Sequence, residues 1–363
     1  MAVAYRDIEL PAAGPVETVP AKVGTTFNWD YKVKREELLR LYEKGKRAQW
    51  NASTDIDWSI DVDPERTRPE AADVFDEVLQ PPEKLDLAMR RKLNHHMDAW
   101  MLSQFLHGEQ GALLATARIV ETVPWLEAKL YASNQVADEA RHVEVYRRYL
   151  TEKLGLSYPV NRHLDTLLKQ IVEDSRWDMT YLGMQIMVEG LALAAFALMR
   201  FTRADEPLLQ QITTAVMRDE ARHVAFGVLS LEDLYTKELS STELREREEF
   251  VIEATVLMRD RLLMEEVWER VGLDPKLWLP WSLRTPFMVG FRQMLFSKIV
   301  PNLRRLGLLT PRVREKFAEM DLLQFENMPD STQVEETAMP PALAAFFAYL
   351  QKSGVPVPGL SSN

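Results

Sequence analysis

The sequence predicts an all-α protein whose centre is a four-helix bundle, and two observations lead to this prediction. Apolar residues recur at helical spacing through long stretches without proline, and these stretches are bounded by prolines, glycines or polar turns. In addition, the five residues Asp-Glu-Ala-Arg-His occur twice, at 138–142 and at 219–223. We call these two segments the repeated motif. Its Glu and His are three residues apart, so each copy presents a carboxylate and an imidazole on one helix face.

Composition limits the classes of protein that fit. The 363 residues are 46% hydrophobic and 27% charged, with a net charge of -11 and no cysteine. Disulfides, iron–sulfur clusters and cysteine nucleophiles are therefore excluded, and any metal must be bound by oxygen and imidazole ligands. No long basic run is present, which argues against nucleic acid as the main partner. Residues 1–20 lack the basic leader and apolar core of a signal peptide, so we expect a cytoplasmic protein.

The helices can be placed in order along the chain. Pro124 separates the first two long helices, Gly155 and Pro159 end the second, and a turn at 203–207 separates the third from the fourth. Prolines make 1–31 an extended arm, and Pro275 and Pro280 make 272–286 a loop. The expected helices span 34–50, a short segment before Pro81, 83–123, 125–154, 163–173, 177–202, 208–239, 240–271 and 287–306.

We expect one structural domain built from three segments. Residues 1–82 form the N-terminal arm and flanking helices, 83–240 form the bundle, and 241–363 form C-terminal helices and a tail packed on it. The apolar stretch from Met179 to Met199 is almost long enough to cross a bilayer. Gln185 and Glu189 lie near its middle, however, and no basic flank supports insertion, so we predict a buried bundle helix and no membrane span.

Two further glutamates belong with the repeated motif. Glu109 and Glu139 are 30 residues apart, and the midpoint is Pro124. Glu189 and Glu220 are 31 residues apart, and their midpoint falls in the turn at 204–205. In an antiparallel hairpin, residues equidistant from the turn lie at the same height, here roughly 22 Å from each turn. All four glutamates can therefore share one level of the bundle.

This arrangement predicts a dinuclear metal site. A single Glu-x-x-His pair usually lies on a solvated helix face, and a lone Glu in an apolar helix can pair with an arginine. Two motifs with two partner glutamates form the ligand set of a dinuclear iron or manganese centre, and two divalent cations would neutralise four carboxylates. The predicted ligands are Glu109, Glu139, His142, Glu189, Glu220 and His223.

The remaining charged residues of the repeated motif can support the metal ligands. Asp138 and Asp219 can each accept the second ring proton of a ligand histidine, which fixes its tautomer. Arg141 and Arg222 can pair with these aspartates across the hairpins, the alternative being that all four are ordinary surface charges.

These residues resemble the ferritin-like di-iron carboxylate superfamily, over about residues 84–240. Its oxygen-activating members include bacterial multicomponent monooxygenases, the p-aminobenzoate N-oxygenase group, acyl carrier protein desaturases and ribonucleotide reductase small subunits. The N-oxygenase group carries one more ligand histidine, one turn before its last Glu, where this chain has Val216. The resemblance implies a ferritin-like bundle, two iron ions or a manganese–iron pair, and O2 as co-substrate. It also implies a small, largely apolar substrate that is hydroxylated or N-oxygenated, an external electron donor such as a reductase or ferredoxin, and a homodimer.

Helical phase indicates the residues around the metals. Tyr146 follows His142 by four residues on the same face, in a register that resembles the radical tyrosine of ribonucleotide reductase small subunits. It is either redox-active or a core tyrosine with a hydrogen-bonded hydroxyl. The remaining pocket candidates share a face with a ligand: Phe105, Ala112, Leu113, Thr116, Gln185, Ala192, Leu193, Phe196, Val216, Val224 and Gly227.

Two other functions remain open at this point. One is a radical-generating or oxidase protein like the ribonucleotide reductase small subunit, although the tail after Tyr349 lacks the tyrosine that such a subunit uses for radical relay. The other is a ferroxidase or iron-storage protein. Some 80 residues before the bundle and 120 after it are more than a storage cage needs.

Overall fold

The computed structural model describes residues 16–21, 23–65, 79–333 and 341–355. Within these residues every regular element is a helix, which confirms the predicted all-α class. Four long helical segments form the centre of the molecule. They are α3 (Leu87–Thr122), α4 (Leu126–Arg148), the continuous segment α6 (Trp177–Tyr181), η3 (Leu182–Val188) and α7 (Glu189–Thr202), and α8 (Pro207–Asp233).

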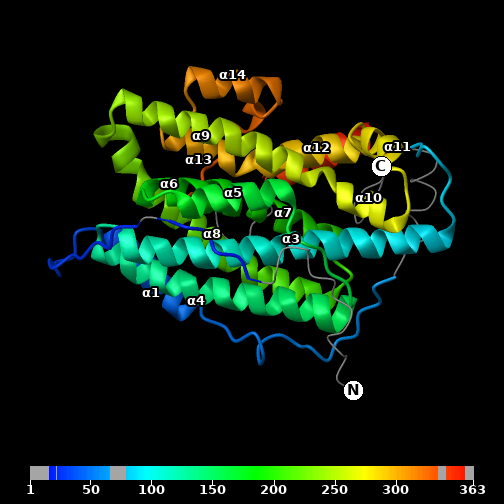
Figure 1. Cartoon of the computed structure of the whole chain (residues 1–363), viewed down its shortest axis with the longest axis horizontal. Coiled ribbons are helices and arrows are strands. Elements are labelled where there is room, and N and C mark those ends of the chain that lie inside the picture. Colours follow the sequence, from blue (N-terminus) through cyan, green and yellow to red (C-terminus); the bar gives the residue numbers. More distant parts are fainter. Residues whose placement is uncertain (1–15, 22, 66–78, 334–340, 356–363) are drawn as a thin grey trace.

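These four segments form two hairpins that pack side by side (Figure 1). The first hairpin is α3 with α4, and the second is α7 with α8. Helix α4 contacts α8, while α3 contacts α6 and η3, so each helix of one hairpin touches the other hairpin. The first turn is at Pro124, between Val123 and Trp125, both in extended conformation. The second is at 203–206, before Pro207 at the first helical position, where its missing N–H is not needed.

π-helical turns lie within one of the four segments and directly after two others. These are η2 (Tyr149–Leu154) after α4, η3 before α7, and η4 (Leu234–Glu238) after α8. The π-helical turn η3 runs directly into Glu189. A π-helical turn inserts an extra residue into a helix and is frequent at functional sites, because it changes which side chains face the interior.

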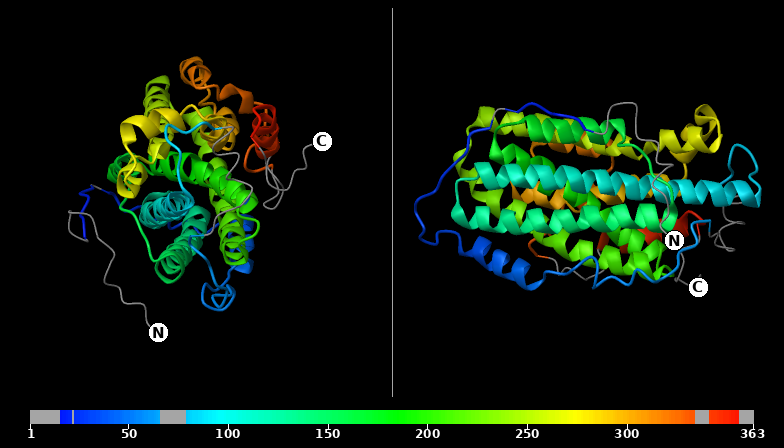
Figure 2. Two further views of the ribbon diagram at one scale, coloured as in Figure 1. Left: turned by 90° about the vertical axis from the view of Figure 1, so that its right-hand side faces the viewer. Right: turned by 60° about the horizontal axis from the view of Figure 1, so that its bottom comes forward.

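Additional helices surround the bundle, as Figure 2 shows in two further views. Helix α1 contacts α4 and α8 on one side, and α5, α9 and α13 cover η3 on the other. Helix α10 contacts α3, and α15 contacts α7. Their bounds are α1 Glu36–Arg47, α5 Arg162–Glu173, α9 Ser241–Asp260, η5 Arg261–Leu263, α10 Glu265–Val271, α11 Pro275–Ser282, α12 Pro286–Met294, η6 Leu295–Ser297, α13 Ile299–Arg305, α14 Pro311–Glu319, η7 Leu323–Phe325 and α15 Pro341–Lys352.

Three predictions about the C-terminal third are wrong. The helix expected at 240–271 is broken, because Met264 takes a left-handed conformation (φ 52°) between η5 and α10. The loop expected at 272–286 contains α11, since Asp274 caps the helix through the backbone N–H of Lys276 and Pro275 occupies its first position. The helix expected at 287–306 is interrupted by η6. The short helix expected before Pro81 falls mainly outside the described residues.

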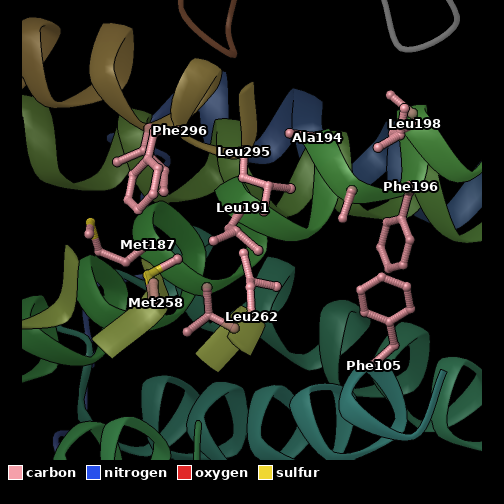
Figure 3. Packing of buried hydrophobic residues seen from close by; sticks show 14 of the residues in the cluster. Phe105, Met187, Leu191, Ala194, Phe196, Leu198, Met258, Leu262, Leu295 and Phe296 are labelled. Carbon is pink, nitrogen blue, oxygen red and sulfur yellow. The ribbon is translucent and has the colours of Figure 1, made fainter. Parts of the chain in front are cut away.

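The apolar stretch ending at Thr202 is a core helix. The segment Trp177–Thr202 passes the length and hydropathy criteria for a membrane span, but 89% of its most apolar window is buried within the protein. Figure 3 shows how this is achieved: Met258 and Leu262 of the C-terminal segment lie beside Leu191, and Phe105 faces Phe196 across the bundle. The protein itself therefore covers the segment, as the sequence predicts.

Candidate metal centre

The structure brings the six predicted ligands together at one level of the bundle. Each of the four helices contributes, and all six side chains are buried. Their donor atoms form two groups, in each of which all atoms lie within 4.8 Å of one another. One group is Glu109, Glu139, His142 and Glu220, and the other is Glu139, Glu189 and His223. Since Glu139 belongs to both groups, the cluster suits two metal ions that share a carboxylate.

The imidazole Nδ1 atoms point at the carboxylates. Nδ1 of His142 lies 3.2 Å from Oε2 of Glu109 and 3.1 Å from Oε1 of Glu220. Nδ1 of His223 lies 3.0 Å from Oε1 of Glu139 and 3.6 Å from Oε2 of Glu220. Glu220 therefore lies close to both histidines, as does Glu139, whose Oε2 is 3.4 Å from Nδ1 of His142.

Several donor atoms of the cluster lack a hydrogen-bond partner. Oε2 of Glu139, Oε2 of Glu189, both carboxylate oxygens of Glu220 and Nδ1 of His223 are buried without a hydrogen bond in the described part of the chain. A buried carboxylate without a partner is costly, and a metal ion is the usual way to compensate it. These atoms fit a pair of hard divalent cations, with oxygen and imidazole as the only ligand types.

The metal-free cluster attracts protons in place of metals. Burial and, to a smaller extent, the nearby Glu220 carboxylate raise the pKa of Glu109 to about 8. The pKa of Glu189 also lies well above its usual range, for the same two reasons. Burial disfavours charge on His142, but the Glu109 carboxylate and the hydrogen bonds to Asp219, Glu109 and Glu139 together outweigh it and raise the pKa of that imidazole well above its usual value. The cluster thus requires positive charge, which protons or metal ions can supply.

The aspartates of the repeated motif bind the histidines of the other copy. Nε2 of His142 donates to Oδ2 of Asp219 (3.1 Å), and Nε2 of His223 donates to Oδ2 of Asp138 (3.2 Å). Each aspartate therefore holds one ring nitrogen as the donor and leaves Nδ1 free to face the carboxylates. These bonds join α4 to α8, so the motifs support each other between the two hairpins.

The arginines of the motif neutralise these aspartates. Arg141 binds Asp138 within its own motif and also lies 3.5 Å from Oδ2 of Asp219, and Arg222 binds Asp219 within its own motif. The expected pairing across the hairpins is seen for Arg141, whose contact with Asp219 links α4 to α8. The closer pairs of both arginines are made along one helix, within each copy of the motif.

Three supporting residues were not found by sequence reasoning. The amide Nε2 of Gln135 donates to Oε1 of Glu139 and Oε1 of Glu189, both at 3.0 Å. Gln135 precedes Glu139 by one helical turn, so its position on the ligand face is a signal that could have revealed it. Gln49 donates to Oδ1 of Asp138 (2.8 Å), and the indole of Trp50 donates to Oδ2 of Asp219 (2.8 Å). Their sequence positions carry no such signal, because the contact depends on how α1 docks.

Tyr146 lies beside the cluster in an apolar setting. Its ring centroid is 5.9 Å from that of Phe105 and 6.1 Å from that of Phe196. The hydroxyl is buried and has no hydrogen bond in the described part of the chain. Burial, with a further contribution from the Glu109 carboxylate, raises its pKa well above the ordinary value, so the phenol keeps its proton. The hydrogen-bonded core tyrosine considered from the sequence is not observed.

Two cavities share Phe105 in their lining, and one of them reaches the cluster. This narrow cavity of about 20 Å³ is lined by Glu109, Glu189 and Glu220, and also by Arg261. A larger one of about 170 Å³ is lined mainly by apolar side chains, among them Met97, Met101, Leu198 and Phe291, and it ends at the same Phe105. Phe105 therefore separates the larger cavity from the space beside the carboxylates.

The pocket residues predicted from helical phase divide into two sets. Phe105, Ala112 and Ala192 line the narrow cavity. The others do not line either cavity: Leu113 is half-buried, and the rest are buried core residues, namely Thr116, Gln185, Leu193, Phe196, Val216, Val224 and Gly227. Helical phase identifies which side chains face inward, but packing decides which of them leave space.

Comparisons with known proteins add little to these observations. No protein-family model and no curated protein matches the sequence. Among solved structures, an R2-like ligand-binding oxidase with an aerobically reconstituted metal cofactor after photoconversion is similar at 18% identity and a TM-score of 0.42, covering 83% of this chain and 94% of its own. Another, with an aerobically reconstituted Mn/Fe cofactor after a long soak, is similar at 17% identity and a TM-score of 0.41, covering 85% and 95%. Similarity at this level does not establish a shared fold or activity, so the proposals below depend on this chain's own helices and side chains.

Proposed function

We propose that this protein is a non-haem dinuclear iron oxidoreductase that uses O2 to oxidise a small, largely apolar organic molecule by hydroxylation or N-oxygenation. The observation that carries the proposal is the pair of buried ligand groups that share Glu139. The six side chains would hold two iron ions, or manganese and iron, with Glu109 and His142 on one side and Glu189 and His223 on the other. Glu139, which belongs to both ligand groups, and Glu220 would complete the ligand set. Such a centre supplies reduction of O2 with electrons delivered from outside the protein.

The surrounding residues prepare the cluster for this role. Asp138 and Asp219 hold the Nε2 protons of the two histidines, which leaves each Nδ1 as the ligand atom. Gln135 holds one oxygen of Glu139 and one of Glu189, so these two carboxylates keep a fixed separation. Phe105, Tyr146 and Phe196 form an apolar wall that excludes water from the side where the cavities lie.

The larger cavity is the proposed substrate space. Its 170 Å³ is similar to an engineered cavity of about 150 Å³ that binds benzene, so a single ring or a short alkyl chain would fit. Its lining is mainly apolar, which favours a substrate with an apolar body. Residues 83–240 would supply the metal site, and the segments before and after it would complete the walls, since Val62 and Phe291 also line this cavity.

Metal content and O2 consumption test the proposal. The purified chain reconstituted with iron should hold about two ions per chain and consume O2 when reduced. Glu139→Ala and Glu220→Ala should lose metal, because each removes a carboxylate of the ligand groups. Glu152→Ala, which removes a half-exposed carboxylate paired with Arg148 beyond the end of α4, is the matched control and should keep both ions. Full metal retention in both variants would refute the site, and iron binding without any reaction with O2 would refute the oxidase.

A further inference from the structure

Arg261 is a buried cation that makes no ion pair in the described part of the chain. It lies at the start of η5, directly after α9, and only 4% of the residue is exposed. Its Nε has no hydrogen-bond partner, and no ion pair of its guanidinium is found among the described residues. The adjacent Asp260 is not the ion-pair partner of Arg261, because its carboxylate binds Arg259 at 2.6 Å. A buried arginine without a partner is rare, since desolvating an unpaired charge costs several kcal/mol.

Arg261 lines the narrow cavity beside the cluster. The same cavity is lined by Glu109, Glu189 and Glu220, so Arg261 and three of the proposed ligands share one space. Three residues later, Met264 lines the larger cavity. The turn from Arg261 to Met264 therefore lines both cavities, as Phe105 also does. The intervening Leu262 packs beside Leu191 in the core, which anchors this turn to the bundle (Figure 3).

The charge balance of the site indicates which kind of ligand Arg261 can bind. Two divalent cations would cancel the four glutamates, and each motif aspartate is cancelled by the arginine of its own motif. Arg261 then leaves one uncompensated positive charge in a buried site. A single monovalent anion would complete the balance, and a dianion such as phosphate would exceed it. The planar guanidinium also matches the two oxygens of a carboxylate.

We propose that Arg261 binds the carboxylate of the substrate, so that the substrate is a small carboxylic acid with an apolar body. The carboxylate would occupy the space between Arg261 and the cluster, and the apolar body would extend past Phe105 toward the larger cavity. This proposal rests on the proposed function, because the charge balance assumes two divalent cations. It names a specificity-determining residue that comes from outside the four bundle segments.

Binding of matched acid and amide probes tests this role. The zinc-loaded protein, which holds divalent cations without redox chemistry, is titrated calorimetrically with benzoate and benzamide, and with propionate and propionamide. The wild type should bind at least one acid roughly ten- to hundredfold more tightly than its amide, because the hydrogen bonds to a charged partner are lost in the amide. Arg261→Gln should remove this preference, and Arg261→Lys should keep part of it. No preference in the wild type, or an undiminished one in Arg261→Gln, would overturn the proposal.

Stability separates this role from a structural one. In the absence of any probe, Arg261→Leu should raise the midpoint of thermal unfolding, because it removes an unpaired buried charge. An arginine that serves the fold would give a lower midpoint, and that result would also overturn the proposal. Metal content is measured in every sample. Loss of the acid preference with two ions retained supports the role of Arg261, whereas a wild type that holds no metal pair contradicts the proposed function instead.

Discussion

Asp219 accepts a hydrogen bond from His142, which lies in the other copy of the repeated motif, 77 residues earlier in the chain. Asp138 does the same for His223. The two copies of the motif are thus mutually dependent, because each supplies the aspartate that orients the imidazole of the other. A consequence is that damage to either copy should affect both halves of the metal centre.

Replacing these aspartates should weaken metal binding. Asp219→Asn and Asp138→Asn each remove a charged acceptor from a histidine, which typically costs roughly 10- to 100-fold in metal affinity. The indole of Trp50 would also lose its charged acceptor in Asp219→Asn. Competition with a chromogenic chelator measures the affinity. Asp233→Asn, at a half-exposed carboxylate of α8 that pairs with Lys237, is the control and should leave the affinity unchanged.

Removing the hydroxyl of Tyr146 should stabilise the protein and alter its chemistry. The hydroxyl is buried without a partner, so Tyr146→Phe should raise the free energy of unfolding by about 1 kcal/mol. If the phenol takes part in the reaction, the same variant should consume O2 more slowly with its metal content unchanged. Tyr131→Phe is the matched control, because it also removes a buried, unpartnered hydroxyl from α4. Identical rates of O2 consumption in wild type and Tyr146→Phe would show that Tyr146 has only a packing role.

A methyl group at Gly227 should destabilise the bundle next to the cluster. A Cβ there would lie 2.6 Å from Cβ of Gln185, which belongs to η3, one turn before Glu189. Gly227→Ala should therefore cost about 1–3 kcal/mol in the free energy of unfolding and weaken metal binding. Gly108→Ala on α3 is the contrasting case, since nothing lies within 4 Å of its Cβ. It should stabilise the helix by about 0.5–1 kcal/mol, and chemical denaturation distinguishes the two outcomes.

His96 should make the protein less stable in mild acid. Burial lowers the pKa of this imidazole to about 4, and its Nδ1 lies 2.6 Å from the hydroxyl of Tyr158. Between pH 6.5 and 4 the unfolded chain binds a proton that the folded chain does not, so this contribution to stability is lost as the pH falls through that range. His96→Gln should lose less stability than the wild type between pH 7 and 5. Urea unfolding of both metal-free proteins measures the difference, and parallel losses would contradict the assignment.

The sequence predicts the bundle well because its signals are local. Pro124 and the turn before Pro207 bound helices whose apolar periodicity is long and uninterrupted, and the observed helices end within a few residues of the predicted positions. The same local signals place Glu109 beside Glu139, because both residues lie equally far along the chain from the turn at Pro124. The left-handed Met264 could not be predicted, because a methionine carries no preference for that conformation and only the packing around it imposes the turn.

The supporting residues were predicted less completely for a related reason. Gln135 shares a helix face with Glu139 and could have been inferred from its position. Trp50 and Arg261 could not, because their contacts with the cluster are set by how α1 and α9 dock on the bundle. A helix face predicts which residues turn inward along one element, whereas the partners supplied by distant segments depend on the complete tertiary structure.

The cross-connected motifs also have a consequence for how the chain folds. In the proposed centre, the ligands come from four helices and the supporting aspartates from opposite hairpins, so neither hairpin would form it alone. Metal uptake should therefore follow assembly of the bundle in time, and once bound the ions would join the hairpins into one cooperative unit. Loading would act as the last step of maturation, and release of the ions would be the first step by which the hairpins separate.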